Sequence, residues 1–339
     1  MDRRSEPAAL IDLIGACWTT QALYVAADLG LADLLAQQPA SAEQLAACTR
    51  SHPDALRRLL RALVSLGLCA EGADGLYALT PAGQPLRKDV PASLHALAIW
   101  WGRYCWPEMQ GLGESVRTGA SARTLANGGG AYARLAQDGD AAAVFHRAMR
   151  SRTRLMAQAL ARRLDVSDCR CVLDLGGGEG ELIAALLLAH PHLRGMLLDR
   201  PHALCGAKTF LAQLGLEARC ELLAGDFFVS VPPGADLVVL KSVLHNWDDD
   251  QAARILANCW LALRPGARLL VIERVLPPRM HSSGACRAAM RADLNMLVGP
   301  GGRERDEHEF RALLQCAGLA VQTLLPLDAE LSVITASAV

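Results

Sequence analysis

Lysine is scarce in this chain. Only Lys88, Lys208 and Lys241 are present, and arginine supplies the rest of the 34 basic residues, against 35 acidic ones. A protein that binds nucleic acid mainly through the phosphates needs a basic surface. The balanced charge therefore argues against a nucleic-acid binder that relies on bulk electrostatics, although local basic patches remain open.

The sequence also lacks paired cysteines and long apolar runs. Its 11 cysteines are scattered, with neither a C-x-x-C motif nor paired metal-ligand spacing. We expect free thiols in the cytosol and no bound metal. The apolar run 182–189 is far below the ~18 residues that span a bilayer, and no secretory leader opens the chain. These absences predict a cytoplasmic protein without a membrane or nucleic-acid partner.

A glycine-rich segment follows the apolar strand that ends near Asp174. Glycine lets the backbone turn sharply and approach a ligand, and the next helix points its positive N-terminus at the same place. A dinucleotide fingerprint would require glycine at 181 or 183, where Glu181 and Ile183 stand. The spacing D-x-G-x-G-x-G fits instead, and Asp174 could attract the amino group and sulfonium of S-adenosylmethionine. We predict a site for this cofactor that includes Gly176 and Gly178, with a turn of another doubly wound sheet as the alternative.

Two further segments extend this site in chain order. Asp199 ends the next predicted strand, about 20 residues beyond the glycines, where an acid would bind ribose hydroxyls. It could instead cap a helix, since Pro201 follows closely. After a third strand, Asp226 offers an acceptor for an adenine amino group, and Phe227 offers a ring for stacking.

The second half of the chain alternates between short apolar strands and helices. Strands separated by helices form a parallel sheet, and a closing pair joined by a short link adds an antiparallel edge. We therefore predict an α/β fold with a doubly wound, mostly parallel seven-stranded sheet. Its strands are expected at 170–175, 193–198, 219–224, 235–241, 267–273, 319–325 and 331–336.

The first half is predicted to be mainly helical. Apolar residues within 8–37 recur at three- and four-residue spacing, Ser41 and Gln44 can form a capping box, and Pro53 begins another helix. A short strand at 77–80 completes the winged-helix order of helices and hairpin. The last of these helices carries Arg57, Arg58 and Arg61. DNA binding is therefore an alternative to a solvated helix face.

These patterns divide the chain into three expected regions. They are a winged-helix domain over 1–90, a helical linker and pocket wall over 91–160, and a Rossmann-like catalytic domain over 161–339. The middle region begins with four of only 15 aromatic residues: Trp100, Trp101, Tyr104 and Trp106. The sequence leaves open whether they form a pocket wall or an ordinary core.

His245 follows the predicted strand 235–241. It should lie near the carboxyl edge of the sheet, where open α/β sheets bind their ligands, so it is placed to touch a substrate beside the cofactor. The acids just after it have a structural explanation. Asp248 and Gln251 together are typical of a helix start.

The whole chain resembles the bacterial relatives of the plant caffeate-type class of S-adenosylmethionine-dependent O-methyltransferases. The matching motifs are 174–180, Asp199, 225–228, 240–247 and 301–305. The resemblance implies a class I methyltransferase fold and an N-terminal domain that forms a homodimer rather than binding DNA. It also implies that His245 is the general base and that Glu273 and Glu304 flank and orient its ring.

The resemblance extends to ligand contacts. It implies that Asp226 and Lys241 contact the cofactor. It also implies contacts to a small aromatic, phenolic acceptor from Phe145, Met149, Met290, Asn295 and Met296. Ring C-methylation would use the same groups, and some members hydroxylate, decarboxylate or close rings instead. These chemistries remain alternatives to methylation of a hydroxyl.

Overall fold

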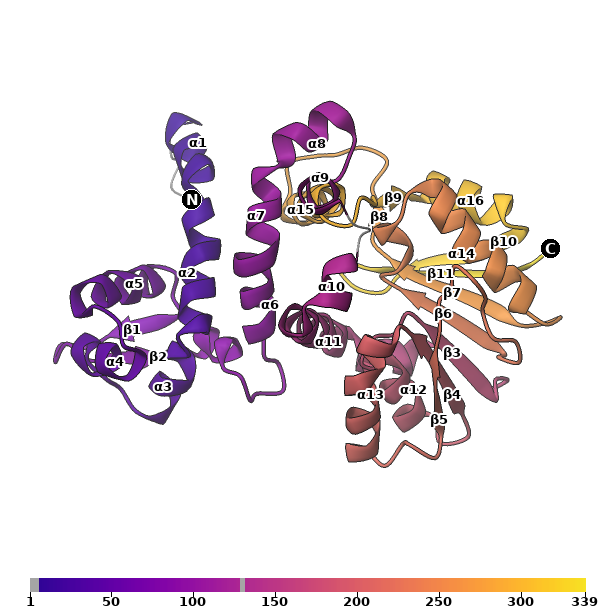
Figure 1. Ribbon diagram of the computed structural model, residues 1–339, viewed down its shortest axis with the longest axis horizontal. Helices are drawn as coiled ribbons and strands as arrows, with labels where there is room; N and C mark the ends of the chain where they lie inside the picture. Colours follow the sequence, from indigo (N-terminus) through magenta and orange to yellow (C-terminus); the bar gives the residue numbers. More distant parts are fainter. Residues whose placement is uncertain (1–5, 129–131) are drawn as a thin grey trace. The chain divides into compact units, whose positions relative to one another are not determined.

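The computed structural model describes residues 6–128 and 132–339 (Figure 1). The chain divides into two compact units, Met1–Trp106 and Pro107–Val339. The helical region expected over 91–160 is thus shared between the two units. Every side chain proposed for the cofactor, the acceptor or catalysis belongs to the second unit.

The first unit is mostly helical. A two-stranded antiparallel hairpin, β1 (Cys69–Glu71) and β2 (Tyr77–Leu79), follows the helices, as the winged-helix pattern predicted. The helices are α1 (Glu6–Gly15), α2 (Cys17–Asp28), α3 (Leu31–Gln37), α4 (Ala42–Thr49), α5 (Pro53–Ser65) and α6 (His95–Ile99), with a 3-10 turn η1 (Pro81–Leu86) and a π-helical turn η2 (Trp100–Cys105). The capping box of Ser41 and Gln44 at the start of α4 is confirmed.

Two features of this unit bear on the alternatives that the sequence left open. Trp100 and Tyr104 are 7% and 8% exposed and stack with ring centroids 5.0 Å apart, so both belong to the core. Arg57 on α5 forms ion pairs with Asp54, at 2.6 Å, and with Glu43. It is therefore a solvated, paired side chain of the helix surface.

An apolar helical stretch lies near the N-terminus. In the part of the chain that the structure describes, Pro7–Asp28 is long and apolar enough to cross a membrane by length and composition alone. The expectation drawn from 182–189, that no apolar run is long enough, is therefore wrong for this stretch. Four side chains on α1 are between 57% and 72% exposed: Leu10, Ile11, Leu13 and Ile14. An apolar surface of this kind usually contacts a partner.

The second unit is built on the predicted seven-stranded sheet. The strand order is β10-β11-β7-β6-β3-β4-β5, parallel from β7 to β5 and antiparallel at β11 and β10. This confirms the mostly parallel sheet with an antiparallel edge. The strands are β3 (Cys171–Leu175), β4 (Arg194–Asp199), β5 (Cys220–Ala224), β6 (Leu237–Lys241), β7 (Arg268–Glu273), β10 (Leu319–Pro326) and β11 (Ser332–Ala338).

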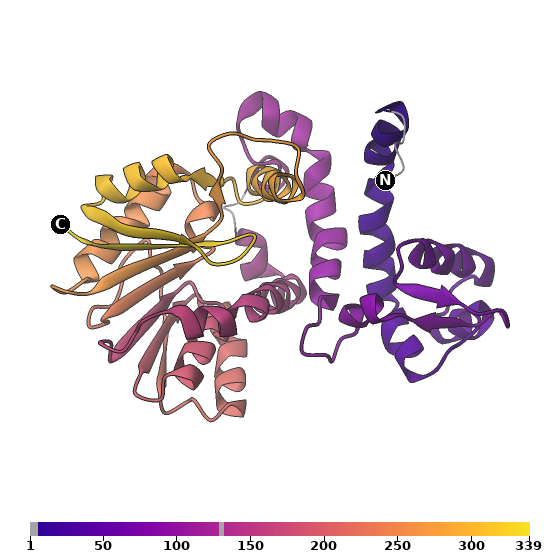
Figure 2. The same ribbon diagram turned by 180° about the vertical axis from the view of Figure 1, so that it is seen from behind.

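Helices cover both faces of this sheet (Figure 1, Figure 2). Because central strands are buried on both sides, they read as continuous apolar runs in the sequence. One face packs against α11 (Gly139–Arg163), α12 (Glu181–Ala189) and α13 (Pro201–Gln213), and the other against α14 (Asp249–Ala262) and α16 (Glu307–Cys316). The remaining helices are α7 (Trp106–Gln110), α8 (Leu112–Thr118), α9 (Ala122–Asn127), α10 (Ala133–Gln137) and α15 (Gly284–Val298).

A short parallel pair was not predicted. β8 (Val275–Leu276) pairs with β9 (Arg305–Asp306), in the register of Val275 opposite Arg305. Segments of two residues have no periodicity from which they could be detected. The pair brings the chain just after Glu273 beside the chain just after Glu304.

Candidate active site

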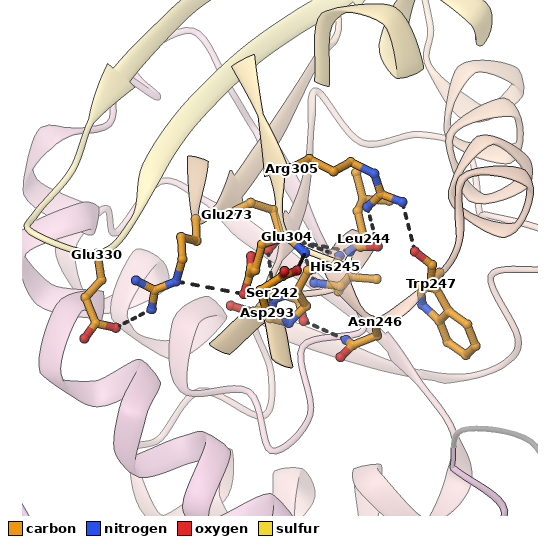
Figure 3. A network of polar contacts seen from close by, with 12 residues as sticks. Ser242, Leu244, His245, Asn246, Trp247, Glu273, Asp293, Glu304, Arg305 and Glu330 are labelled. Atoms are coloured by element: carbon orange, nitrogen blue, oxygen red, sulfur yellow. Dashed lines mark hydrogen bonds and ion pairs between the residues drawn. The ribbon is translucent and has the colours of Figure 1, made fainter. Parts of the chain in front are cut away.

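His245 lies in a short turn at the carboxyl edge of the sheet (Figure 3). The turn, η3 (Leu244–Asn246), begins three residues after the last residue of β6. The Nδ1 atom of His245 lies 3.1 Å from Oε1 of Glu304 and 3.6 Å from Oε2 of Glu273. The three side chains that the resemblance assigned to catalysis therefore lie together.

Glu273 is fully buried at the end of β7 and holds the turn by its backbone. Its Oε1 accepts hydrogen bonds from the N–H groups of Val243 and Leu244, both at 2.9 Å, and a longer one from His245 at 3.4 Å. Its Oε2 faces the imidazole and accepts no hydrogen bond from the described residues. One carboxylate thus holds the backbone of the turn and places a negative charge beside the imidazole ring.

Burial and charge oppose one another in this cluster. Burial alone would lower the pKa of His245, but the charges of Glu273 and Glu304 more than offset it, so the pKa is raised above its ordinary value. Burial raises the pKa of Glu273, and the charge of His245 opposes that shift. The imidazole therefore takes up a proton more readily than a free histidine does.

Arg305 holds the same turn through its carbonyl groups. Its guanidinium donates hydrogen bonds to the carbonyls of Leu244 and Trp247, at 3.0 and 2.9 Å, as Figure 3 shows. It also pairs with Asp249 at 2.7 Å, and only 1% of the Arg305 side chain is exposed. The sequence did not single out this residue, because its partners lie some 60 positions away.

The loop before Arg305 packs directly on the histidine. A Cβ atom at Gly302 would lie 2.1 Å from the carbonyl oxygen of His245, and the Arg303 N–H donates to that oxygen at 2.9 Å. Ser242 precedes the turn with φ of +54°, a left-handed conformation that is uncommon outside glycine. Such strain persists only where the surrounding structure enforces it.

The glycine loop surrounds a buried acid. Asp174 is 1% exposed, its Oδ2 has no hydrogen-bond partner among the described residues, and burial raises its pKa to about 7. A Cβ at Gly177 would lie 2.4 Å from the Asp174 Cγ, whereas a Cβ at Gly178 would meet open space. A buried polar atom without a partner is costly unless a ligand satisfies it. The loop therefore fits a ligand with a cationic or hydrogen-donating group.

Asp199 and Asp226 lie beside this loop. Asp199 ends β4, and its Oδ2 accepts the N–H of Gly178 at 2.8 Å. Asp226 accepts a hydrogen bond from the Arg200 guanidinium at 2.6 Å. The structure therefore brings both predicted acids to the same end of the sheet, and it gives each a protein partner that the sequence did not indicate.

Aromatic rings gather at the same edge. The Trp247 ring centroid lies 6.2 Å from that of Phe227 and 5.7 Å from that of Tyr132, which is 6.0 Å from that of Phe145. Phe227 and Phe145 were predicted, whereas Tyr132 and Trp247 were missed. Aromatic residues are scarce in this chain, so each one is a candidate ligand contact. In the sequence, however, the densest aromatic cluster lies at 100–106, in the first unit.

Lys241, the last residue of β6, forms a hydrogen bond with helix α11. Its Nζ donates to the Thr153 hydroxyl at 3.0 Å, and burial, followed by the charge of Arg152, lowers its pKa to about 8. The same helix carries Phe145 and Met149, which are half-buried.

The other predicted acceptor contacts lie on α15. This helix runs beside the Glu304 loop, since Asp293 accepts the N–H of Glu304 at 2.8 Å. Met290 is half-buried and Met296 is 9% exposed. The Oδ1 of Asn295 is buried without a hydrogen-bond partner in the described chain, so it is available to a ligand.

Replacing Arg305 by leucine should destabilise the second unit. The change leaves the carbonyls of Leu244 and Trp247 without the guanidinium that donates to them, and an unsatisfied buried acceptor typically costs about 1–3 kcal/mol. Urea unfolding would measure the free energy. Arg303→Ala is the matched control, because that side chain is 47% exposed and should contribute less than about 1 kcal/mol. Equal losses in both variants would contradict the assignment.

Asp174→Asn should flatten the pH dependence of stability. The carboxyl group has a pKa near 7 in the folded protein against 3.8 when unfolded, so the unfolded chain loses this proton first as pH rises. The free energy of unfolding should then fall by about 4 kcal/mol between pH 4 and 8 on account of this group. Unfolding of both proteins at pH 5 and pH 8 would test this. Parallel pH curves for the two proteins would show that Asp174 is not the group responsible.

Sequence comparison shows what this chain is similar to. Residues 109–320 match the O-methyltransferase domain, and residues 11–89 match the O-methyltransferase dimerisation domain. The chain is 36% identical to phenazine O-methyltransferase PhzM of Lysobacter antibioticus, covering 96% of this chain and 95% of that protein. It is 40% identical to the mitomycin biosynthesis 6-O-methyltransferase of Streptomyces lavendulae, covering 94% and 90%.

Solved structures extend the similarity to the fold. The structure of LaPhzM matches with a TM-score of 0.95 and 35% identity over 99% of this chain and 100% of that one. That of the O-methyltransferase NcsB1, in complex with S-adenosylmethionine and 2-hydroxy-5-methyl naphthoic acid, matches with a TM-score of 0.81 and 34% identity over 95% and 96%. By its two domains and their nearly complete coverage, the chain belongs to the O-methyltransferase family.

Proposed function

We propose that the chain transfers a methyl group from S-adenosylmethionine to a hydroxyl of a small aromatic natural product, with His245 as the general base. The observation that carries the proposal is the imidazole bonded at Nδ1 to Glu304, at 3.1 Å, with the carboxylate of Glu273 3.6 Å from the same nitrogen. Within the described residues no group bonds its Nε2, so this nitrogen is available to an acceptor hydroxyl.

The proton of the acceptor would pass to Nε2 as the methyl group moves. A simple phenol has a pKa of ~10 and free imidazole ~6.5, so complete transfer beforehand is uphill by about 5 kcal/mol. Glu273 and Glu304 narrow this gap, because their charges raise the pKa of His245. They would also keep the first proton on Nδ1 and stabilise the imidazolium, as in a catalytic triad.

The loop residues suit the methyl donor. Bound S-adenosylmethionine would supply an electrophilic methyl group. The unpartnered oxygen of Asp174 would accept a hydrogen bond from the donor's amino group, and Asp199 would hold the ribose hydroxyls. Asp226 and Phe227 would contact the adenine, and Lys241 would support this end of the site. The neighbouring structure of NcsB1 contains the same donor.

The acceptor would lie between α11 and α15. Phe145 and Met149 would contact one side of it, and Met290, Asn295 and Met296 the other. An aromatic acceptor agrees with the naphthoic acid bound in NcsB1. Relatives act on compounds as different as O-demethylpuromycin and 3-amino-4-hydroxybenzoate, so family membership alone does not define the acceptor.

Other chemistry occurs on this scaffold. The chain is 36% identical to aclacinomycin 10-hydroxylase RdmB of Streptomyces purpurascens and 32% identical to a phenazine-1-carboxylate N-methyltransferase of Pseudomonas aeruginosa. A base with two supporting acids suits a hydroxyl acceptor, which must lose a proton. Ring C-methylation would use the same groups, and locating the transferred label by mass spectrometry distinguishes the products.

The side chains of His245, Glu273 and Glu304 are close enough together to hold a metal ion. The ligand atoms of His245, Glu273 and Glu304 lie within 4.8 Å of one another. A proton shared between Nδ1 and Glu304 accounts for their 3.1 Å separation, which is an ordinary hydrogen-bond distance. The proposed reaction therefore uses no metal ion.

His245→Ala should lose about 10²- to 10⁴-fold in turnover, the usual contribution of general-base catalysis, while it still binds S-adenosylmethionine. Transfer of a labelled methyl group to a panel of phenols measures the rate, and calorimetry measures binding. His281→Ala, at an exposed histidine, is the control. Adding EDTA should change neither enzyme. Unchanged turnover in the His245 variant would remove this residue from the mechanism.

A homodimer through the first unit, in a cytoplasmic enzyme, would bury the apolar face of α1. Ile14→Asp should therefore yield a monomer of 36.2 kDa where the parent protein has twice that mass, as measured by light scattering after gel filtration. Leu188→Asp is the control, since it places the same charge at an exposed leucine of α12. A monomeric parent protein that sediments with lipid vesicles would favour a membrane contact instead.

A further inference from the structure

We propose that the acceptor carries a carboxylate and that Arg152, on α11, binds it. This inference rests on the proposed function and specifies its acceptor. It makes Arg152 a specificity-determining residue, separate from the groups that move the proton or hold the methyl donor.

Arg152 lies on the face of α11 that carries the predicted acceptor contacts. Phe145, Met149 and Arg152 are spaced by four and three residues, which places them in one row along the helix. The next residue, Thr153, bonds the Nζ of Lys241 at 3.0 Å, so this turn of α11 lies at the carboxyl edge of β6. An acceptor that reaches the histidine along this face would therefore pass Arg152.

A chain of charges connects Arg152 with the base. Arg152 lies 3.5 Å from Oε2 of Glu330, and Arg274 lies 2.8 Å from the same oxygen. The Nε of Arg274 is in turn 3.9 Å from Oε1 of Glu304, which bonds His245. Figure 3 shows Glu330 at one end of this network. The site of Arg152 is thus continuous with the catalytic cluster.

Pairing of Arg152 is incomplete. Its ion pair with Glu330 is the longer of the two that this carboxylate makes, and within the described residues its guanidinium donates no hydrogen bond. A guanidinium has five N–H donors in a planar fork that matches a carboxylate. The side chain is 43% exposed, so a ligand can reach these donors.

The surroundings of Arg152 favour an additional anion. The negative charges of Glu330 and Glu304 act on Arg152, and the positive charges of Arg274 and Arg291 oppose them. Three arginines therefore share this region with two carboxylates, of which Glu304 is already engaged with the imidazole. A carboxylate on the acceptor would supply the missing negative charge and bind the fork in a bidentate manner.

The test compares matched acceptors. Hydroxylated carboxylic acids on benzene, naphthalene and phenazine skeletons are each paired with the neutral carboxamide. Equilibrium binding in the presence of S-adenosylhomocysteine and methyl transfer are measured for both. The parent protein should prefer the acid by about 10- to 100-fold, the range of a charge-assisted hydrogen bond. Arg152→Gln should lose that preference while its binding of the amide changes less than about threefold.

The controls separate the possible failures. Arg147→Gln removes an exposed charge from the same helix and should keep the preference. Glu330→Gln removes the competing carboxylate and should tighten binding of the acid. Equal binding of acid and amide on all three skeletons, or equal losses for both in Arg152→Gln, would overturn the inference. Methyl transfer to amides alone would leave the proposed function intact, whereas selective acid binding without any transfer would refute that function alone.

Discussion

The active site depends on the contact between the buried carboxylate of Glu273 and the turn that carries His245. The Oε1 atom of Glu273 accepts hydrogen bonds from the backbone N–H groups of the two residues before the histidine, and its Oε2 atom faces the imidazole. Because β7 pairs with β6 up to Ile272, which lies opposite Lys241, the sheet sets the distance between Glu273 and the turn that follows β6. Arg305 then binds the carbonyl side of the same turn. The position of His245 is therefore a property of the sheet edge rather than of a free loop.

This arrangement places polar atoms where a stable core would avoid them. Oxygens of Asp174, Glu273 and Glu304 are buried without hydrogen-bond partners among the described residues. Each lies where a ligand or the imidazole can compensate it. Burial raises the pKa of Asp174 and Glu273, so the unliganded protein is less stable than its packing alone would make it. Ligand binding should recover part of that stability.

Different elements carry different parts of the chemistry. The strand ends of the parallel sheet hold the groups assigned to the donor, together with His245 and Glu273, and the loop before β9 adds Glu304. Helices α11 and α15 carry the groups assigned to the acceptor. Side chains on a helix face can change without disturbing the register of the sheet. Arg152 illustrates this, since its replacement would alter the choice of acceptor and leave the His245 turn in place. Such a division agrees with the range of acceptors named among the relatives.

Local patterns in the sequence determined the seven strands, the glycine loop after Asp174 and the acid at the end of β4, because each depends on neighbouring residues. The Asp248 cap, which accepts the N–H of Gln251 at 2.8 Å, was predictable for the same reason. The position of His245 at the sheet edge followed from the strand before it, whereas the placement of Glu273 and Glu304 beside its ring was anticipated only through family resemblance. Only the tertiary structure shows the hydrogen bonds of Arg305 to the His245 turn and the short β8–β9 pair. The same holds for the contact of the Tyr132 ring with Trp247 and for the ion pairs of Glu330 with two arginines. These contacts join residues that are far apart in the chain. Periodicity and spacing describe neighbouring residues only, so they do not predict which distant side chains meet in the folded protein.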